Sequence, residues 1–175
     1  MLEQDSDLVA GLLDDPPRLL VDPSPWLIVF CVGREHDLRA VEYAIEFGGT
    51  PQDVTITTTG PADAEGLVGL VRDLVSDPRF RPGMLILEDC TAIDASKVTS
   101  SDLRAKADTY IALSEQIGPS KLAIIVPSPA SFGFARMWDF FLGNRTEMES
   151  RVFYSQADGL AWLESERVAR LAPAS

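Results

Sequence analysis

The sequence predicts an α/β fold: a mixed, mostly parallel sheet with an antiparallel hairpin at its N-terminal side and helices packed on it. Two patterns lead to this prediction. Residues 41–58 contain two alternating apolar runs around a turn rich in glycine and proline, which is typical of a hairpin. From residue 61 onward, helical patterns alternate with short apolar runs, which indicates crossovers between parallel strands. A chain of 175 residues is long enough for one such domain.

The first predicted elements are the two hairpin strands, Val41–Phe47 and Val54–Thr58, joined by residues 48–53. The helix that follows is expected to open with Pro61 in its first turn, because proline lacks the N–H that goes unused there. It is expected to stop at Asp77-Pro78.

Two short apolar runs, Met84–Leu87 and Leu122–Val126, are expected to be central strands covered on both faces. Between them, Thr99–Asp102 forms an N-cap cluster for a helix over Leu103–Ile117, which Gly118 is placed to end. The remaining predicted elements are a helix over Ser131–Leu142, a strand over Val152–Tyr154 and a final helix that ends near Arg170.

Three segments are expected along the chain. Residues 1–25 are predicted to be a flexible acidic tail, because acidic clusters and proline pairs fill them. Residues 26–40 are a peripheral segment, in which Trp26–Val32 is either an outlying strand or a surface that meets a partner; the strand is favoured. Residues 41–170 form a single α/β domain.

Composition excludes several classes of protein. The net charge is −12 and no basic stripe is present, so nucleic acid and anionic membrane surfaces are not expected partners. Stable membrane insertion is not expected either, because the apolar runs are too short. Cys31 and Cys90 form neither a disulfide framework nor a metal-binding pair, and the N-terminus lacks a basic signal segment. A cytoplasmic location is therefore predicted.

No catalytic signature is found in the sequence. The GxGxxG, Walker, GxSxG and HExxH patterns are missing, and the one histidine, His36, is read as a solvated loop residue. We therefore predict no catalytic residue, no cofactor and no metal, and expect a module that acts by binding.

A polar loop is predicted over residues 88–98, at the carboxyl end of a central strand, where ligands of open α/β sheets bind. Its carboxylates Glu88, Asp89 and Asp94 are of the type that holds a divalent cation. The alternative, which is favoured, is that they accept backbone hydrogen bonds and tie down the loop.

The Ser131–Leu142 helix is apolar almost all round, whereas a surface helix needs only one apolar stripe. Something besides the sheet is therefore expected to cover it: the final helix, the Trp26–Val32 segment, a second subunit or an apolar ligand. The candidate partner- or ligand-binding residues are Phe132, Phe134, Arg136, Met137, Trp138 and Phe141.

Residues Met84–Ile117, Lys121–Val126 and Phe132–Met137, with the closing Val152–Leu163, resemble the STAS-like (anti-sigma-factor-antagonist-like) group, which is related to SEC14-type lipid-binding folds. The resemblance covers about residues 41–165. It implies a small regulatory or binding fold without a cofactor. It also implies a phosphorylated serine early in the helix after the central strand, for which Ser96 is the nearest equivalent.

The sequence thus leaves three hypotheses, in this order. The first is a non-catalytic regulatory module that binds a protein partner, with self-association into a homodimer through the Ser131–Leu142 helix. The second is a protein that binds a small apolar or lipid-like ligand. The third is a metal-dependent enzyme that works through Glu88, Asp89 and Asp94.

Overall fold

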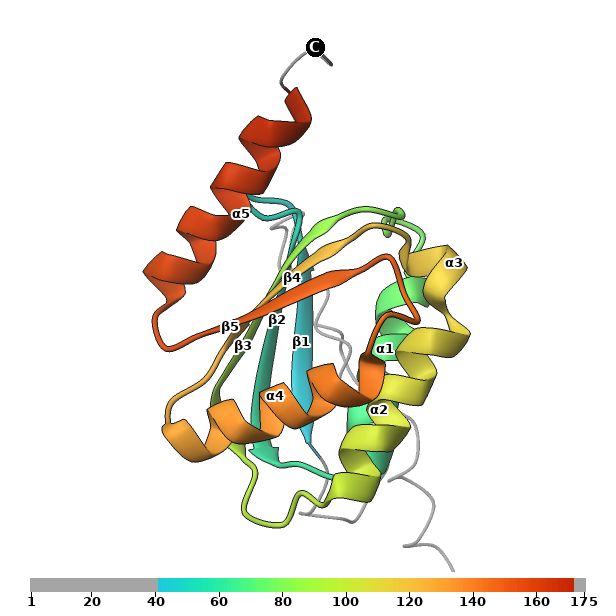
Figure 1. Ribbon diagram of the computed structural model, residues 1–175, viewed down its shortest axis with the longest axis vertical. Helices are drawn as coiled ribbons and strands as arrows, with labels where there is room; N and C mark the ends of the chain where they lie inside the picture. The colour runs from blue at the N-terminus through green and yellow to red at the C-terminus, as the bar shows by residue number, and fades with distance from the viewer. Residues whose placement is uncertain (1–40, 172–175) are drawn as a thin grey trace, which may run out of the picture.

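The computed structural model describes residues 41–171 as a sheet with helices on both faces (Figure 1). The predictions for residues 1–25, Trp26–Val32, Cys31 and His36 lie outside the described residues. In chain order the elements are β1 Glu42–Phe47, β2 Val54–Pro61, α1 Ala64–Ser76, β3 Leu85–Asp94, α2 Ser100–Ala112, α3 Ser114–Ile117, β4 Lys121–Ile125, α4 Pro129–Leu142, β5 Glu149–Phe153 and α5 Gln156–Leu171.

The sheet has five strands in the order β1-β2-β3-β4-β5. Strands β1 and β2 are antiparallel and form the predicted hairpin, in which Phe47 pairs with Val54. The other neighbours, β2 with β3, β3 with β4 and β4 with β5, are all parallel. The predicted α/β class, with its mixed, mostly parallel sheet and its N-terminal hairpin, is therefore confirmed.

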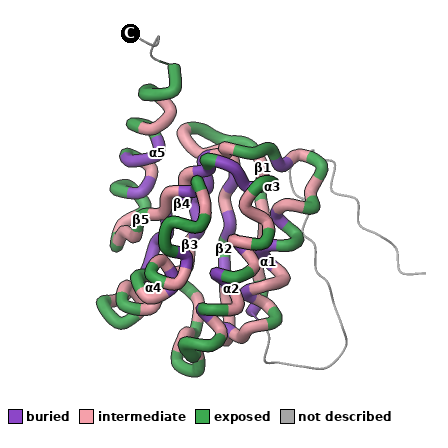
Figure 2. The backbone as a smooth tube through the Cα atoms, turned by 45° about the vertical axis from the view of Figure 1, so that its right-hand side comes forward, coloured by how far each residue is buried: buried purple, intermediate pink, exposed green. Residues whose placement is uncertain are grey.

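The strand order decides which face each helix covers. Each parallel crossover adds the next strand on the same side, and parallel crossovers are right-handed, so α1, α2 and α4 all lie on one face of the sheet. Their apolar side chains meet those of Ile56, Ile86 and Ile124 in the larger core cluster. Figure 2 shows the buried residues along these central strands.

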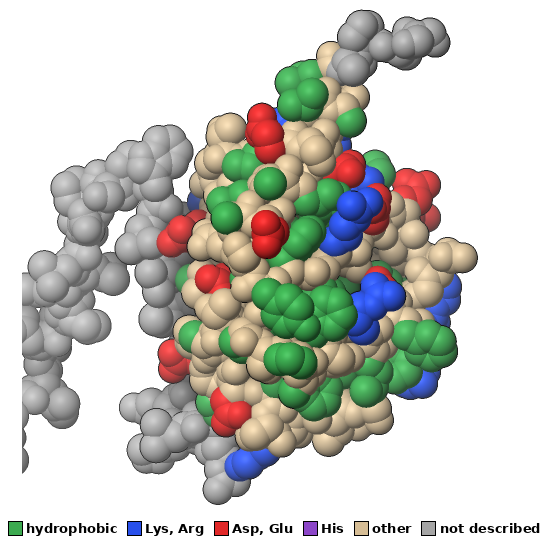
Figure 3. All heavy atoms as spheres, turned by 60° about the vertical axis from the view of Figure 1, so that its left-hand side comes forward, with side chains coloured by type: hydrophobic (Ala, Val, Ile, Leu, Met, Phe, Trp, Pro, Cys, Tyr) green, Lys and Arg blue, Asp and Glu red, His purple; other side chains and the backbone are tan. Residues whose placement is uncertain are grey.

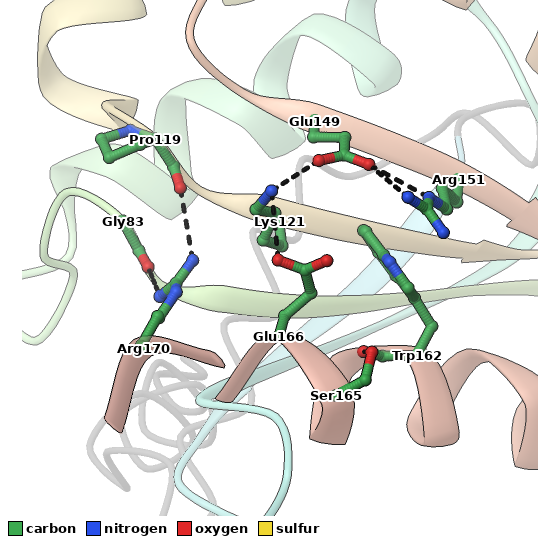
Figure 4. A network of polar contacts seen from close by, with 9 residues as sticks. All are labelled: Gly83, Pro119, Lys121, Glu149, Arg151, Trp162, Ser165, Glu166 and Arg170. Atoms are coloured by element: carbon green, nitrogen blue, oxygen red, sulfur yellow. Dashed lines mark hydrogen bonds and ion pairs between the residues drawn. The ribbon is translucent and has the colours of Figure 1, made fainter. Parts of the chain in front are cut away.

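Helix α5 packs on the opposite face, against Leu87, Ala123 and Ile125. It can approach closely because Gly159 faces the sheet, where a Cβ would lie 2.6 Å from Ile125 Cδ1. Polar contacts fix the rest of the helix (Figure 4): Lys121 Nζ lies 3.2 Å from Glu166 Oε2, and Arg170 donates to the carbonyl oxygens of Gly83 and Pro119.

Several helix boundaries differ from the sequence prediction, and α2 and α4 begin earlier than predicted, at Ser100 and Pro129. Pro61 ends β2 instead of opening α1, because Asp63 is the N-cap: its Oδ1 accepts a hydrogen bond from Gly66 N at 2.7 Å. The helix predicted over Leu103–Ile117 divides into α2 and α3 at Leu113, whose dihedral angles (φ −104°, ψ 14°) are not helical. The N-cap cluster is confirmed, since Thr99 and Asp102 form a capping box.

No helix among residues 41–171 is both long enough and apolar enough to cross a bilayer.

Candidate functional site

A cavity of about 70 Å³ lies at the carboxyl end of the central strands, between the sheet and helices α2 and α4. It is partly open to solvent, and its walls are mostly apolar. Strand β4 contributes Ile124, Val126 follows directly after that strand, α2 contributes Leu103, and α4 contributes Phe134 and Ala135. A cavity needs only about 10–15 Å³ to hold one water molecule, so this one has room for a small organic molecule.

A buried ion pair lines the cavity. Lys106 Nζ of α2 donates to Glu88 Oε1 of β3 over 2.7 Å, and the two side chains are 8% and 1% exposed. Burial by itself lowers the pKa of Lys106, but the charge of Glu88, the hydrogen bond to it and the nearby Tyr110 and Cys90 together outweigh burial, and the net pKa is raised. Lys106 is therefore protonated at neutral pH, and the pair carries no net charge.

Cys90 follows Glu88 on the same face of β3, and its thiol donates to Glu88 Oε1 over 3.7 Å. Burial, and then the nearby Glu88 charge, raise the pKa of Cys90 to about 12. Because the thiolate is the reactive form of cysteine, this thiol is a poor nucleophile at neutral pH.

Two buried polar atoms of cavity-lining side chains have no hydrogen-bond partner among residues 41–171: Glu88 Oε2 and Trp138 Nε1. Both residues are almost completely buried, at 1% and 2% exposed. The Trp138 ring is fixed between two side chains of α2: Lys106 Nζ lies 5.4 Å from its centroid, and the Tyr110 ring packs edge-on at 5.2 Å. The Trp138 ring thus forms a fixed part of the cavity wall beside the buried ion pair.

A β-bulge shapes the strand side of the cavity. Thr57 pairs with Asp89, but Thr59 pairs with Ala92, so β3 contains one more residue than β2 in this stretch. In a regular strand, residues an odd number apart face opposite sides of the sheet. The extra residue lets Cys90 and Ile93, three positions apart, both line the cavity. Bulges beside binding sites commonly redirect side chains in this way.

The prediction that Glu88, Asp89 and Asp94 lie in a loop is wrong. Glu88, Asp89 and Asp94 all lie within β3, because parallel pairing with β2 continues to Pro61↔Asp94. Neighbouring strand residues point to opposite faces, so Glu88 is buried against α2 while Asp89 is not. Among residues 41–171, no group of three acidic, histidine or cysteine side chains is placed to hold a metal ion.

The two aspartates make local hydrogen bonds, as the favoured alternative predicts. Asp89 Oδ1 accepts from Thr91 N at 2.9 Å, and Asp94 Oδ1 accepts from Ser96 N at 2.9 Å. The bonds from Ser96 lower the pKa of Asp94. Ser96 is exposed and precedes α2 by several residues, so the structure does not place it at a helix start.

The six residues proposed from the sequence of α4 lie in different surroundings. Phe134 and Trp138 line the cavity, whereas Phe132 stacks on Tyr154 with centroids 5.3 Å apart and Phe141 lies under the Arg104 guanidinium. The other two are Arg136, which is exposed and paired with Asp139, and Met137, which is half-buried. The outward residue Phe140 is 80% exposed, so residues 41–171 do not cover the whole helix.

Sequence reasoning missed Lys106, although a signal was present. Leu103, Ala107 and Tyr110 of α2 are buried at helical spacing, and Lys106 stands in the same stripe. A lysine is almost never fully buried unless it is paired, so its position predicts a buried acidic partner. Nothing local to β3 shows that Glu88 is that partner.

No protein-family model and no curated protein matches the chain. Among solved structures, it is similar to an uncharacterized protein from the DUF3478 family with a SpoIIAA-like fold, from Shewanella loihica PV-4. The two are 19% identical, the match covers 75% of this chain and 99% of the other, and the TM-score is 0.49. This likeness concerns the fold and assigns no activity.

Proposed function

We propose that this domain binds a small, largely apolar molecule in the cavity between α2 and α4. One observation carries the proposal: a mostly apolar cavity lies at the carboxyl end of the strands, with the buried Lys106–Glu88 pair in its wall. Small-molecule sites are typically concave and apolar with a few placed polar groups, and in open α/β sheets they lie at this end of the strands.

The reactive groups in the cavity favour binding over chemistry. The Cys90 thiol stays protonated at neutral pH, and so does the Lys106 amine, so neither is activated as a nucleophile. The ion pair instead holds β3 and α2 together beside the cavity. The site is thus suited to hold a molecule without transforming it.

Xenon provides a direct test, because it is apolar and fills cavities without hydrogen bonding. Under xenon pressure, we expect methyl NMR shifts at cavity residues such as Leu103, Ile124 and Val126. Ala135→Leu places a larger side chain into the cavity and should abolish these shifts, whereas Ala161→Leu, at an exposed position of α5, should not. Wild-type protein without cavity shifts would overturn the proposal. Native mass spectrometry of freshly purified protein should in addition show an adduct that Ala135→Leu loses.

A second candidate function, self-association through the outer face of α4, is favoured by the exposure of Phe140 and Tyr154, at 80% and 57%. Isolated exposed apolar residues are common, and Figure 3 shows apolar side chains on one side of the molecule in several groups among charged ones. Sedimentation of wild type and Phe140→Asp tests it. Trp138 is unsuitable for this test because it is buried. A monomeric wild type at all concentrations would remove the candidate.

A further inference from the structure

Val41, the first described residue, lies beside the cavity. Strand β1 is antiparallel to β2, and Glu42 pairs with Thr59, so β1 starts at the carboxyl end of the parallel strands. Val41 is 5% exposed and packs on α1, where a Cβ on Gly66 would lie 2.3 Å from Val41 Cγ1. The next residue of α1, Leu67, is part of the cavity wall. The chain before Val41 therefore joins the domain at the same end of the sheet as the cavity.

An apolar segment stands close to this point in the sequence. Trp26–Val32 lies outside the described residues, and its sequence is WLIVFCV, seven residues without a charge. Removing such side chains from water is favourable, so the segment gains free energy wherever it finds an apolar surface. Eight residues separate it from Val41, and a fully extended chain of that length spans about 26–29 Å. The segment can therefore reach the cavity, and the connection keeps it near this end of the sheet.

The cavity matches an uncharged apolar segment. It is partly open, and the lining residues Ile93 and Val98 are only half-buried. The charged residues that line it, Glu88 and Lys106, neutralise each other, so its wall does not require a charged partner. The outer face of α4 around Phe140 is a poorer match, because an exposed ion pair lies on that helix.

We propose that Trp26–Val32 docks on the cavity of its own chain. A cavity of about 70 Å³ takes only one or two side chains, so the rest of the segment covers the half-buried wall around the opening. The inference rests on the proposed function in one respect: the segment and the small molecule share one cavity, so each must displace the other. The apparent affinity for the molecule is then reduced by the fraction of time that the cavity is free. The segment thus regulates access to the site.

A charged variant of the segment, Ile28→Asp with Val29→Asp, tests the docking in the full chain. Adjacent residues of an extended segment point to opposite sides, so a charge is introduced on each side, and burying either charge is costly. We expect this segment variant to shift the methyl NMR resonances of the cavity residues Leu103, Ile124 and Val126. These resonances should not depend on protein concentration in wild type, because the contact forms within one chain.

The matched control is Leu19→Asp with Leu20→Asp, which adds the same two charges outside the segment. It should leave the cavity resonances unchanged. The methyl groups of Leu87 and Ile125, which pack under α5 on the opposite face of the sheet, should keep their positions in both variants and so report an intact fold.

Xenon binding tests the competition. The segment variant should bind xenon at least about 3-fold more tightly than wild type, which corresponds to a wild-type cavity that the segment occupies for about two thirds of the time. The control variant should bind xenon as wild type does.

The outcomes separate the two proposals. Cavity resonances that stay unchanged in the segment variant, or that shift equally in the control, overturn the docking. Wild-type cavity resonances that change on dilution would assign the segment to a second copy and also overturn it, as would equal xenon affinities in the segment variant and wild type. If the segment variant shifts the cavity resonances but xenon perturbs neither protein, the docking stands and the proposed function fails.

Discussion

The buried pair of Lys106 and Glu88 yields the sharpest prediction about stability. At 2.7 Å and an effective dielectric constant of about 20, two unit charges attract by about 6 kcal/mol. Desolvation of the two ions costs several kcal/mol each, so the intact pair contributes little net stability. Lys106→Met removes one charge and leaves Glu88 buried without a counter-charge. We expect this variant to lower the free energy of unfolding by about 3–5 kcal/mol.

Replacing both charges should restore most of that loss. Since the costs of burying both ions disappear, Lys106→Met with Glu88→Leu should unfold within about 2 kcal/mol of wild type, or be more stable. Urea unfolding followed by circular dichroism measures all the variants. Arg136→Met is the matched control, because its pair with Asp139 is exposed, and it should cost no more than about 0.5 kcal/mol. The reasoning would be refuted if the double variant lost as much free energy of unfolding as the single variants Lys106→Met and Glu88→Leu lose together.

The same pair also determines how the stability of the protein should depend on pH. In wild type the folded pKa of Lys106 is raised above its ordinary 10.5, so the stability it contributes is complete below that pH and is lost as the pH rises past it. In Glu88→Gln, burial is no longer outweighed by Glu88, and the folded pKa of Lys106 falls below the unfolded value. The unfolded state then binds more protons, so the variant should become more stable from about pH 7 to about pH 9.5 relative to wild type. A variant whose stability relative to wild type stays flat across this range would show that Lys106 keeps its charge in the folded state without Glu88, which contradicts the prediction.

Two further predictions concern a glycine and a cysteine. Gly159→Ala should destabilise the protein by about 1–2 kcal/mol in urea unfolding, because its Cβ would lie 2.6 Å from Ile125 Cδ1. Gly133→Ala in α4, where nothing lies within 4 Å, should instead stabilise it by about 0.5–1 kcal/mol; equal effects at both sites would contradict the close packing of α5. In Cys31→Ser protein, Cys90 should react with iodoacetamide at pH ~8 roughly 1,000-fold more slowly than in urea, because its pKa is about 12 instead of 9.0. Similar rates in native and unfolded protein would show that the thiol is not shielded.

Local signals explain which elements the sequence predicts well. The hairpin strands, the capping box of Thr99 and Asp102, and the helix end at Leu142 depend on residues close together in the chain. Strand β3 was predicted too short for the opposite reason. The stretch from Glu88 to Asp94 resembles a loop, but pairing with β2, some thirty residues earlier, keeps it in the sheet, and Glu88 and Asp89 also pair with β4.

The candidate site, too, could be predicted from the sequence only in part. Composition and periodicity were enough to indicate an α/β domain, and the apolar sequence of α4 placed Phe134 and Trp138 among the candidates. The partner of Lys106, the bulge that turns Ile93 into the cavity and the cavity itself were decided by the tertiary structure alone. Helix and strand signals are local, whereas burial, ion pairing and cavities depend on which distant segments meet across the sheet.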